Sequence, residues 1–155
     1  MLPYTIHVEL TEKQPFAVWQ IDQRVWLITA DGERITARDV ETYAAKFDLP
    51  MVVGAGANTG ASDILAAITR HPRVAALFAS VVRVGGRRWD IHLSNGMVVL
   101  LPEENIEEAL AKMEVLDSEQ GLFSRDIESV DFRIGGRLVV KPGASANSVL
   151  EGENT

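Results

Sequence analysis

Alternating apolar and polar residues mark several short stretches of the chain, a pattern typical of strands that bury one face. The alternation appears in YTIHVEL (residues 4–10) and returns in FAVWQ and RVWLITA. Asp31-Gly32 then predicts a tight turn into ERITA. We therefore expect the first part of the chain to be built mainly from strands.

The clearest strand pattern lies in the middle of the sequence. Two turn dipeptides, Gly85-Gly86 and Asn95-Gly96, separate the stretches SVVRV, RRWDIHLS and MVVLL, which predicts three strands in a meander. Alternate residues of the middle strand should point to opposite faces of a sheet. One face then carries Trp89, Ile91 and Leu93, and the other carries Arg88, Asp90 and His92.

Helical spacing occurs between the strands. Residues 38–47 can form a helix, a second should run from Ala61 to just before Pro72, and a third short one should precede the strand near residue 80. Residues 102–117 form an acidic amphipathic helix, with Pro102 at its entry. The chain is thus predicted to be α+β, with a mostly antiparallel sheet and two to three helices.

The last apolar stretches predict a hairpin at the end of the fold. IESVDFRI and RLVVK flank Gly135-Gly136, and the polar residues 143–155 after them are expected to be disordered. No later strand follows RLVVK in the sequence, so this strand should lie at a sheet edge, where it can template an incoming strand. We expect a proline at Val139 to remove one amide donor from that edge.

Composition narrows the classes of function. The 155 residues carry a net charge of −7 and no cysteine, and 46% of them are hydrophobic. An acidic chain lacks the basic footprint of a nucleic-acid binder, and the absence of cysteine excludes disulfides and thiolate metal sites. Neither a membrane-spanning stretch nor a signal peptide is predicted.

The glycine-rich segment LPMVVGAGANTGASDILAAI (residues 49–68) raises the alternative of a nucleotide-binding module. Gly54, Gly56 and Gly60 give G-x-G-x-x-x-G, one residue longer than the dinucleotide fingerprint, and no Lys-Ser/Thr follows Gly60. The strand before them is short, and no later βαβ repeat appears. The segment is therefore interpreted as a structural loop that leads into a helix.

Other candidate chemistry is weaker. His7, His71 and His92 lie in separate elements and predict no metal site. Asp131 and Arg133 are interpreted as a charge pair rather than a catalytic dyad, and no serine lies in a nucleophile motif. A basic stretch is either solvated or a docking surface for an acidic partner; it comprises Arg70, His71, Arg73, Arg83, Arg87 and Arg88.

The three tryptophans leave a carbohydrate-binding module as a further alternative, because exposed rings can form a platform for sugars. Trp19, Trp26 and Trp89 all fall on apolar positions of predicted strands. We therefore interpret them as core residues.

Five stretches, taken in order, resemble the extracytoplasmic part of the bacterial cell-division family FtsQ/DivIB. They are IHVELTEKQPFAVWQ (6–20), LITADGERI (27–35), LPMVVGAGA (49–57), RRWDIHLSNGMVVLLP (87–102) and IESVDFRIGGRLVVK (127–141). The resemblance implies that residues 1–11 are the last strand of a POTRA domain and residues 12–142 a β domain with a curved sheet. It also implies that a membrane-spanning helix, which this chain lacks, and most of POTRA precede this segment in family members.

The resemblance implies a scaffold rather than an enzyme, with no cofactor and no metal. Such a scaffold belongs to the divisome at the septum, on the periplasmic side of the inner membrane, where FtsB- and FtsL-type proteins are its partners. Self-association is compatible with this role. By position, the resemblance assigns strand-addition binding to the last hairpin, with one arginine assisting; the residues are Arg87, Ile134, Gly135, Gly136, Arg137, Leu138, Val139 and Val140.

Overall fold

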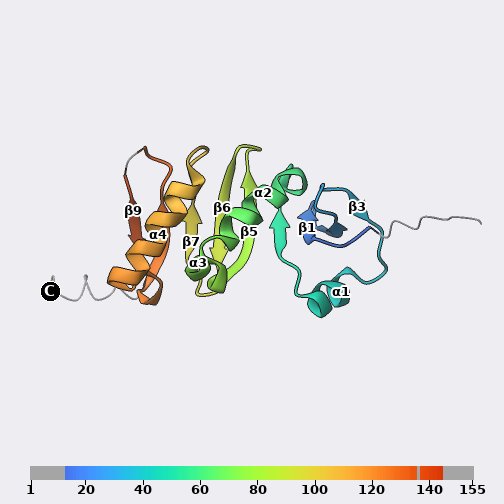
Figure 1. Cartoon of the computed structure of the whole chain (residues 1–155), viewed down its shortest axis with the longest axis horizontal. Helices are drawn as coiled ribbons and strands as arrows, with labels where there is room; N and C mark the ends of the chain where they lie inside the picture. Colours follow the sequence, from blue (N-terminus) through green and yellow to red (C-terminus); the bar gives the residue numbers. More distant parts are fainter. Residues whose placement is uncertain (1–12, 136, 145–155) are drawn as a thin grey trace, which may run out of the picture.

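The computed structural model describes residues 13–135 and 137–144, which form one nine-stranded sheet with helices packed against it. The strand order across the sheet is β3-β2-β1-β4-β5-β6-β7-β8-β9 (Figure 1). The strands are β1 Ala17–Ile21, β2 Arg24–Ile28, β3 Arg34–Ile35, β4 Met51–Val53, β5 Phe78–Val84, β6 Arg88–Leu93, β7 Val98–Leu100, β8 Ile127–Asp131 and β9 Val139–Pro142. The helices are α1 Val40–Phe47, α2 Ala57–Thr69, α3 Pro72–Leu77, α4 Ile106–Gln120 and the short 3-10 helix η1 Leu122–Ser124.

The sheet is mixed. The pairs β1–β4, β4–β5 and β7–β8 are parallel, and the other five neighbouring pairs are antiparallel. Parallel neighbours need a crossover connection, and the chain supplies one with α1, one with α2 and α3, and one with α4. The predicted α+β class and the central meander are confirmed. The predicted helix count is too low, because the described residues contain four α-helices.

The hydrophobic core lies between the sheet and the helices α2, α3 and α4, which cover the same face of it (Figure 1). A row of residues in cross-strand register runs along this face with no exposed surface: Val52, Val81, Ile91, Val99 and Val130. The predicted faces of β6 are confirmed, because Trp89, Ile91 and Leu93 are buried while the residues between them are half-exposed.

In the folded chain, glycines of the segment at residues 49–68 allow neighbouring elements to pack closely. Helix α2 begins at Ala57 rather than at the predicted Ala61, so Gly60 lies inside it. A Cβ on Gly60 would lie 2.8 Å from Cζ2 of Trp89, and one on Gly54, which has a φ of 103°, would lie 2.7 Å from the carbonyl oxygen of Arg83. The indole nitrogen of Trp19 donates a 2.9 Å hydrogen bond to the Gly54 carbonyl. Close backbone approach therefore explains these two glycines.

Two sequence-based boundaries differ from the structure. Helix α4 runs from Ile106 to Gln120, whereas residues 102–117 are predicted, and Pro102 lies in the loop before it. The chain enters α4 through Asn105, whose backbone is left-handed with a φ of 63°, and this sharp turn delays the start of the helix. The predicted strand at residues 4–10 and most of the predicted tail, residues 145–155, lie outside the described residues.

The three tryptophans differ in their surroundings. Trp89 is buried in the core, and Trp19 is half-buried against it. Trp26, the cross-strand partner of Trp19, is half-exposed, and the guanidinium carbon of Arg34 lies 4.9 Å from the centre of its ring. The prediction that Trp26 is a core residue is therefore wrong, because its ring lies outside the core cluster and contacts Arg34 of the edge strand β3.

Candidate functional site

Strand β9 forms one edge of the sheet (Figure 1). It pairs with β8 in antiparallel register, with Val140 opposite Val130 and Val139 opposite Asp131. In the part of the chain that the structure describes, no strand pairs with its other side. The prediction that the last strand lies at an edge is thus confirmed, and the backbone of β9 is open to an incoming strand.

The connection between β8 and β9 is longer than the predicted Gly-Gly turn. Strand β8 ends at Asp131 and β9 begins at Val139. The ladder ends there because Phe132 is buried and donates its N–H to the Leu100 carbonyl of β7 at 2.9 Å. A 3.0 Å bond from the N–H of Arg137 to the Ile134 carbonyl closes the tip of the connection.

Backbone hydrogen bonds show which groups of β9 face outward. Residues of a strand direct their N–H and C=O alternately to its two sides. The N–H of Phe132 is directed to β7, so that of Asp131 is directed to β9, which makes Asp131 and Val139 a hydrogen-bonded pair. A second hydrogen bond gives the same result, because the N–H of Gly143 donates to the Asp126 carbonyl at 3.0 Å and is therefore directed to the β8 side. Since the direction alternates along the strand, the N–H of Val139, four residues earlier, is also directed to β8. The N–H and C=O of Val140 therefore face outward.

This orientation corrects one expectation from the sequence. The N–H of Val139 belongs to the ladder with β8, so proline at that position would break the internal sheet rather than the free edge. Val140 is the residue whose N–H an incoming strand can use. Pro142 occupies the next outward-facing position. A proline is tolerated there, because the ladder with β8 needs no N–H from this residue.

Apolar side chains line this edge. Ile134, Val139 and Val140 are 53%, 45% and 41% exposed, so three of the five exposed large hydrophobic residues in the described part of the chain lie on or near this edge. Val140 shares the helix-covered face with its partner Val130, whereas Val139 lies on the opposite face. Beside β9 lies a groove of about 280 Å³ lined by Leu116, Gln120, Leu122, Arg125, Ile127, Leu138 and Val140. An added strand would find apolar contacts there as well as backbone partners.

The sequence reasoning missed the α4 side of this groove. Leu116 and Leu122 belong to α4 and η1, which precede the last hairpin and are not part of it. The signal that could have found them is the apolar series of Ala109, Met113 and Leu116, which continues the core face of α4 beyond its buried part.

The structure does not bring all predicted site residues together. Leu138, Val139 and Val140 lie on or beside β9, while Ile134, Gly135 and Arg137 lie in the connection before it, and Gly136 is outside the described residues. Arg87 is exposed in the β5–β6 turn. Its neighbour Arg88 lies closer to the hairpin, because it lines a cavity of about 400 Å³ together with Arg133, Pro102 and residues 103–105.

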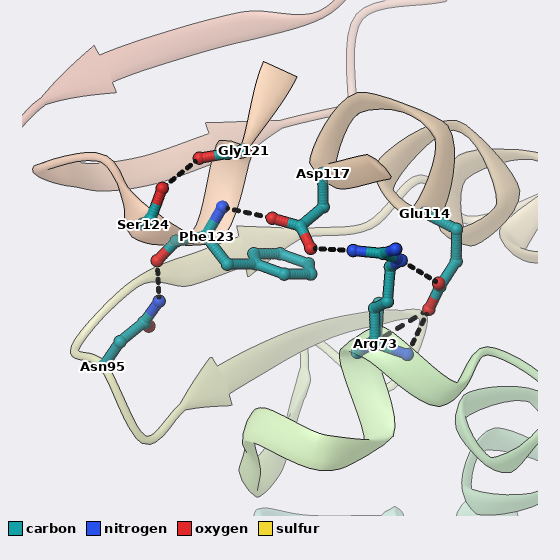
Figure 2. A network of polar contacts seen from close by, with 8 residues as sticks. Arg73, Asn95, Glu114, Asp117, Gly121, Phe123 and Ser124 are labelled. Atoms are coloured by element: carbon teal, nitrogen blue, oxygen red, sulfur yellow. Dashed lines mark hydrogen bonds and ion pairs between the residues drawn. The ribbon is translucent and has the colours of Figure 1, made fainter. Parts of the chain in front are cut away.

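A polar network fixes the segment under the groove (Figure 2). Asp117 of α4 accepts a 2.8 Å bond from the N–H of Phe123 and a 2.9 Å bond from Arg73 of α3. The side chain of Asn95, from the β6–β7 turn, donates to the Phe123 carbonyl at 3.0 Å. Both backbone groups of Phe123 are thus held, and η1 enters β8 along a fixed path.

Helix α4 contacts three of the six residues of the basic stretch predicted from the sequence, namely Arg70, His71 and Arg73. Arg70 and His71 both contact the carboxylate of Glu107, with 2.8 Å between His71 Nε2 and Glu107 Oε2, and these hydrogen bonds lower the pKa of Glu107. Oε1 of Glu114 accepts bonds of 2.8 and 3.0 Å from the N–H groups of Arg73 and Val74, at the start of α3 (Figure 2). These residues join two helices and do not form a free docking surface.

Asp131 and Arg133 form the predicted charge pair at the start of the β8–β9 connection. The guanidinium of Arg133 donates to both carboxylate oxygens of Asp131, at 2.9 and 2.7 Å. These hydrogen bonds hold the pKa of Asp131 below its ordinary value. The pair stabilises the point at which the chain leaves β8, and it gives no indication of acid–base chemistry.

Within residues 13–135 and 137–144, no group of three or more histidine, aspartate or glutamate side chains is placed to hold a metal ion. In the same part of the chain, no helix combines the length and the hydropathy that a membrane-spanning segment requires. The arrangement that the structure does offer is an exposed, apolar, unpaired strand edge beside a groove. Such an edge suits binding of an extended segment.

Comparison with known proteins gives a consistent result. The family model "Cell division protein FtsQ/DivIB, C-terminal" matches residues 17–133. The chain is 40% identical over 153 residues to the cell division protein FtsQ of Bradyrhizobium diazoefficiens, a match that covers 97% of this chain and 43% of the relative. It is also 40% identical over 139 residues to FtsQ of Rhizobium radiobacter, covering 90% of this chain and 65% of that protein.

The chain therefore spans less than two thirds of the length of these relatives. A more remote likeness is to the solved major extracytoplasmic domain of the cell division protein DivIB from Geobacillus stearothermophilus. That match has 15% identity and a TM-score of 0.36, and it covers 72% of this chain and 97% of the other.

Proposed function

The chain belongs to the FtsQ/DivIB family of cell division proteins, and on this premise we propose that it is a non-catalytic scaffold of the division machinery. It binds FtsB- and FtsL-type partners, one of which adds a strand to β9. The site of action is the division septum, on the periplasmic side of the inner membrane, with the anchor supplied by a single N-terminal membrane helix of the full-length protein.

One observation carries the proposal: the outward-facing N–H and C=O of Val140 on an edge strand whose valines are exposed. Strand addition requires free backbone groups for affinity and neighbouring pockets for specificity. The groove lined by Leu116, Leu122 and Leu138 supplies such a pocket on the α4 side. Arg88 and Arg137, both near the β8–β9 connection, add positive charge for an acidic flank of the partner.

The two alternative functions have less support. Packing against Arg83 and Trp89 accounts for Gly54 and Gly60, so the glycine segment gives no reason to expect a bound phosphate. A carbohydrate platform needs accessible tryptophan rings, but Trp89 is buried and Arg34 covers the ring of Trp26.

The test replaces Val140 with proline and measures binding of the C-terminal segment of an FtsB-type partner by calorimetry. Within Val139–Pro142, Val140 is the residue whose N–H faces outward, and Val140→Pro removes that N–H. Because the partner strand then loses one backbone hydrogen bond, we expect its affinity to fall by about tenfold or more. The control Val140→Thr keeps both the N–H and a β-branched side chain, and should bind within about threefold of the wild type.

Circular dichroism and thermal unfolding of both variants would establish that the sheet is intact. Because the N–H of Val140 is not part of the β8–β9 ladder, the proline variant should remain folded. Unchanged affinity in a folded Val140→Pro protein would contradict strand addition at β9.

A further inference from the structure

The turn between β6 and β7 contains Asn95 and Gly96, the only Asn-Gly pair in the sequence, and the proposed function does not use it. The N–H of Gly96 donates to the Leu93 carbonyl at 3.0 Å, and Gly96 has a φ of 90°. Asn95 is exposed to water. Because glycine has no Cβ, its nitrogen is open to the side chain of a preceding asparagine. This pair is therefore a candidate for a reaction within the chain.

Both polar atoms of the Asn95 side chain are bound in the folded chain. Nδ2 donates to the Phe123 carbonyl of η1 at 3.0 Å (Figure 2), and Oδ1 accepts from the N–H of Met97 at 3.0 Å. A carbonyl only accepts and an N–H only donates, so these two contacts fix which way the amide is turned. The N–H of Phe123 is bound by Asp117, so the turn is connected through η1 to α4.

This arrangement contains the reacting groups of a deamidation. The main-chain nitrogen of Gly96 loses its proton to water and attacks Cγ of Asn95, ammonia leaves with Nδ2, and a succinimide ring forms. Water then opens the ring to give aspartate or isoaspartate, so the net change is amide plus water to carboxylic acid plus ammonia. The N–H of Met97 is bound to Oδ1, where negative charge develops during the attack, and it can stabilise that charge.

The folded turn holds this reaction back. The attacking nitrogen of Gly96 is bound to the Leu93 carbonyl, and the departing Nδ2 of Asn95 is bound to Phe123. Both bonds have to open before the attack, so the reaction rate should follow the population of the locally open turn. Because Asn95 and Asp117 hold the two backbone groups of Phe123 together, loss of either contact should raise that population.

We propose that Asn95 is a self-modification site whose deamidation is controlled by the docking of η1 on the β6–β7 turn. The product removes the contact that restrained the reaction. An aspartate at this position presents only acceptors to the Phe123 carbonyl, and isoaspartate also lengthens the main chain of the turn by a methylene group. Deamidation therefore releases η1, which forms one wall of the groove beside β9.

Mass spectrometry of proteolytic peptides, after incubation of the folded protein at mildly alkaline pH, measures conversion at Asn95. Asp117→Ala should raise its rate by about fivefold or more, because a destabilised η1 leaves the open turn more populated. Glu119→Ala, on the exposed side of α4, should convert as the wild type does. Asn58 is an internal reference. Its side chain also donates to a main-chain carbonyl at 3.0 Å, but Thr59 follows it, so it should stay unconverted in all three proteins.

Hydrogen exchange tests the consequence of the reaction. Asn95→Asp reproduces the aspartate product, and amide exchange in η1 should accelerate relative to the wild type. Asn105→Asp, the same change at an exposed asparagine outside the turn, should leave exchange in η1 unchanged.

Equal conversion rates in the wild type and in folded Asp117→Ala would overturn the proposal, as would no conversion of Asn95 in either protein. Unchanged exchange of η1 in Asn95→Asp would also overturn it. Circular dichroism identifies a misfolded variant, and if Asp117→Ala is one, the exchange of η1 in Asn95→Asp decides the question.

Discussion

The two edges of the sheet differ in how they meet solvent. Strand β3, at one edge, has two residues, Arg34 and Ile35, and the guanidinium of Arg34 lies over the ring of Trp26. Strand β9, at the other, has four residues, and its two valines are more than 40% exposed. A short edge strand carrying a charge resists pairing with other chains, whereas a longer apolar one invites it.

The two edges also differ in the residues that surround them. Beside β9, α4 and η1 form a groove with apolar walls, and the polar network around Asp117 keeps η1 in place (Figure 2). Beside β3, the tight turn at residues 29–33 is closed by local hydrogen bonds within the hairpin. We infer that the fold protects one edge and holds the other ready for a partner.

Asp117→Ala should loosen the β9 side of the molecule. The variant leaves the N–H of Phe123 without its acceptor and Arg73 without one of its two carboxylates, so the free energy of unfolding should fall by about 1–3 kcal/mol. Hydrogen exchange should accelerate for β8 and β9 more than for β2 and β3. Glu119→Ala on the exposed side of α4 is the control, and an equal effect of both variants would show that the network does not support this edge.

Asp131→Asn should destabilise the start of the β8–β9 connection by about 0.5–1 kcal/mol near neutral pH, since Arg133 is partly exposed and solvent screens the pair. The pKa of Asp131 is lowered in the folded chain by the hydrogen bonds from Arg133. The contribution of the pair is therefore fully present above the unfolded pKa, about 3.9, and is lost as the pH falls through the folded value.

Chemical denaturation of wild type and Asp131→Asn between neutral and acid pH measures this effect. The gap in unfolding free energy between the two proteins should close below the unfolded pKa of the aspartate. A gap that persists at the lowest pH would mean that the carboxylate charge is not what stabilises the connection.

Arg34→Ala should have the smallest effect on stability, about 0.5 kcal/mol, because it removes one solvent-exposed contact between a cation and an aromatic ring. Exposure of Trp26 should rise, and quenching of its fluorescence by a soluble quencher should increase. Binding of the FtsB-type segment should not change. A measurable loss of binding would place the partner at the β3 edge and overturn the contrast.

Local sequence patterns were sufficient for much of this fold. The meander of β5, β6 and β7 followed from two turn dipeptides and from alternating residues, which depend only on neighbours in the chain. The three parallel pairings could not be read in this way, because they join strands separated by whole helices. The start of α2 at Ala57 was also not predicted, because Gly60 was taken as part of a loop. Its place inside the helix is explained by close packing against Trp89, which is distant in the sequence.

The candidate site was predictable in its location but not in its details. A terminal apolar strand with no successor pointed to an edge, and β9 is that edge. The outward direction of Val140 depends on the register with β8 and on the bond from Phe132 to β7, neither of which appears in the sequence. The groove on the α4 side depends on how α4 and η1 pack beside the hairpin, so the apolar series of α4 marks Leu116 as a packed residue but does not place it at the site.

Strand addition at β9 can be tested by NMR, by mapping backbone amide shifts while the C-terminal segment of an FtsB-type partner is added. The largest shifts should occur at residues 137–141, with Val140 gaining protection from hydrogen exchange, while Arg34 and Ile35 of β3 stay unchanged. Binding that shifts β3 and leaves Val140 unaltered would contradict strand addition at β9.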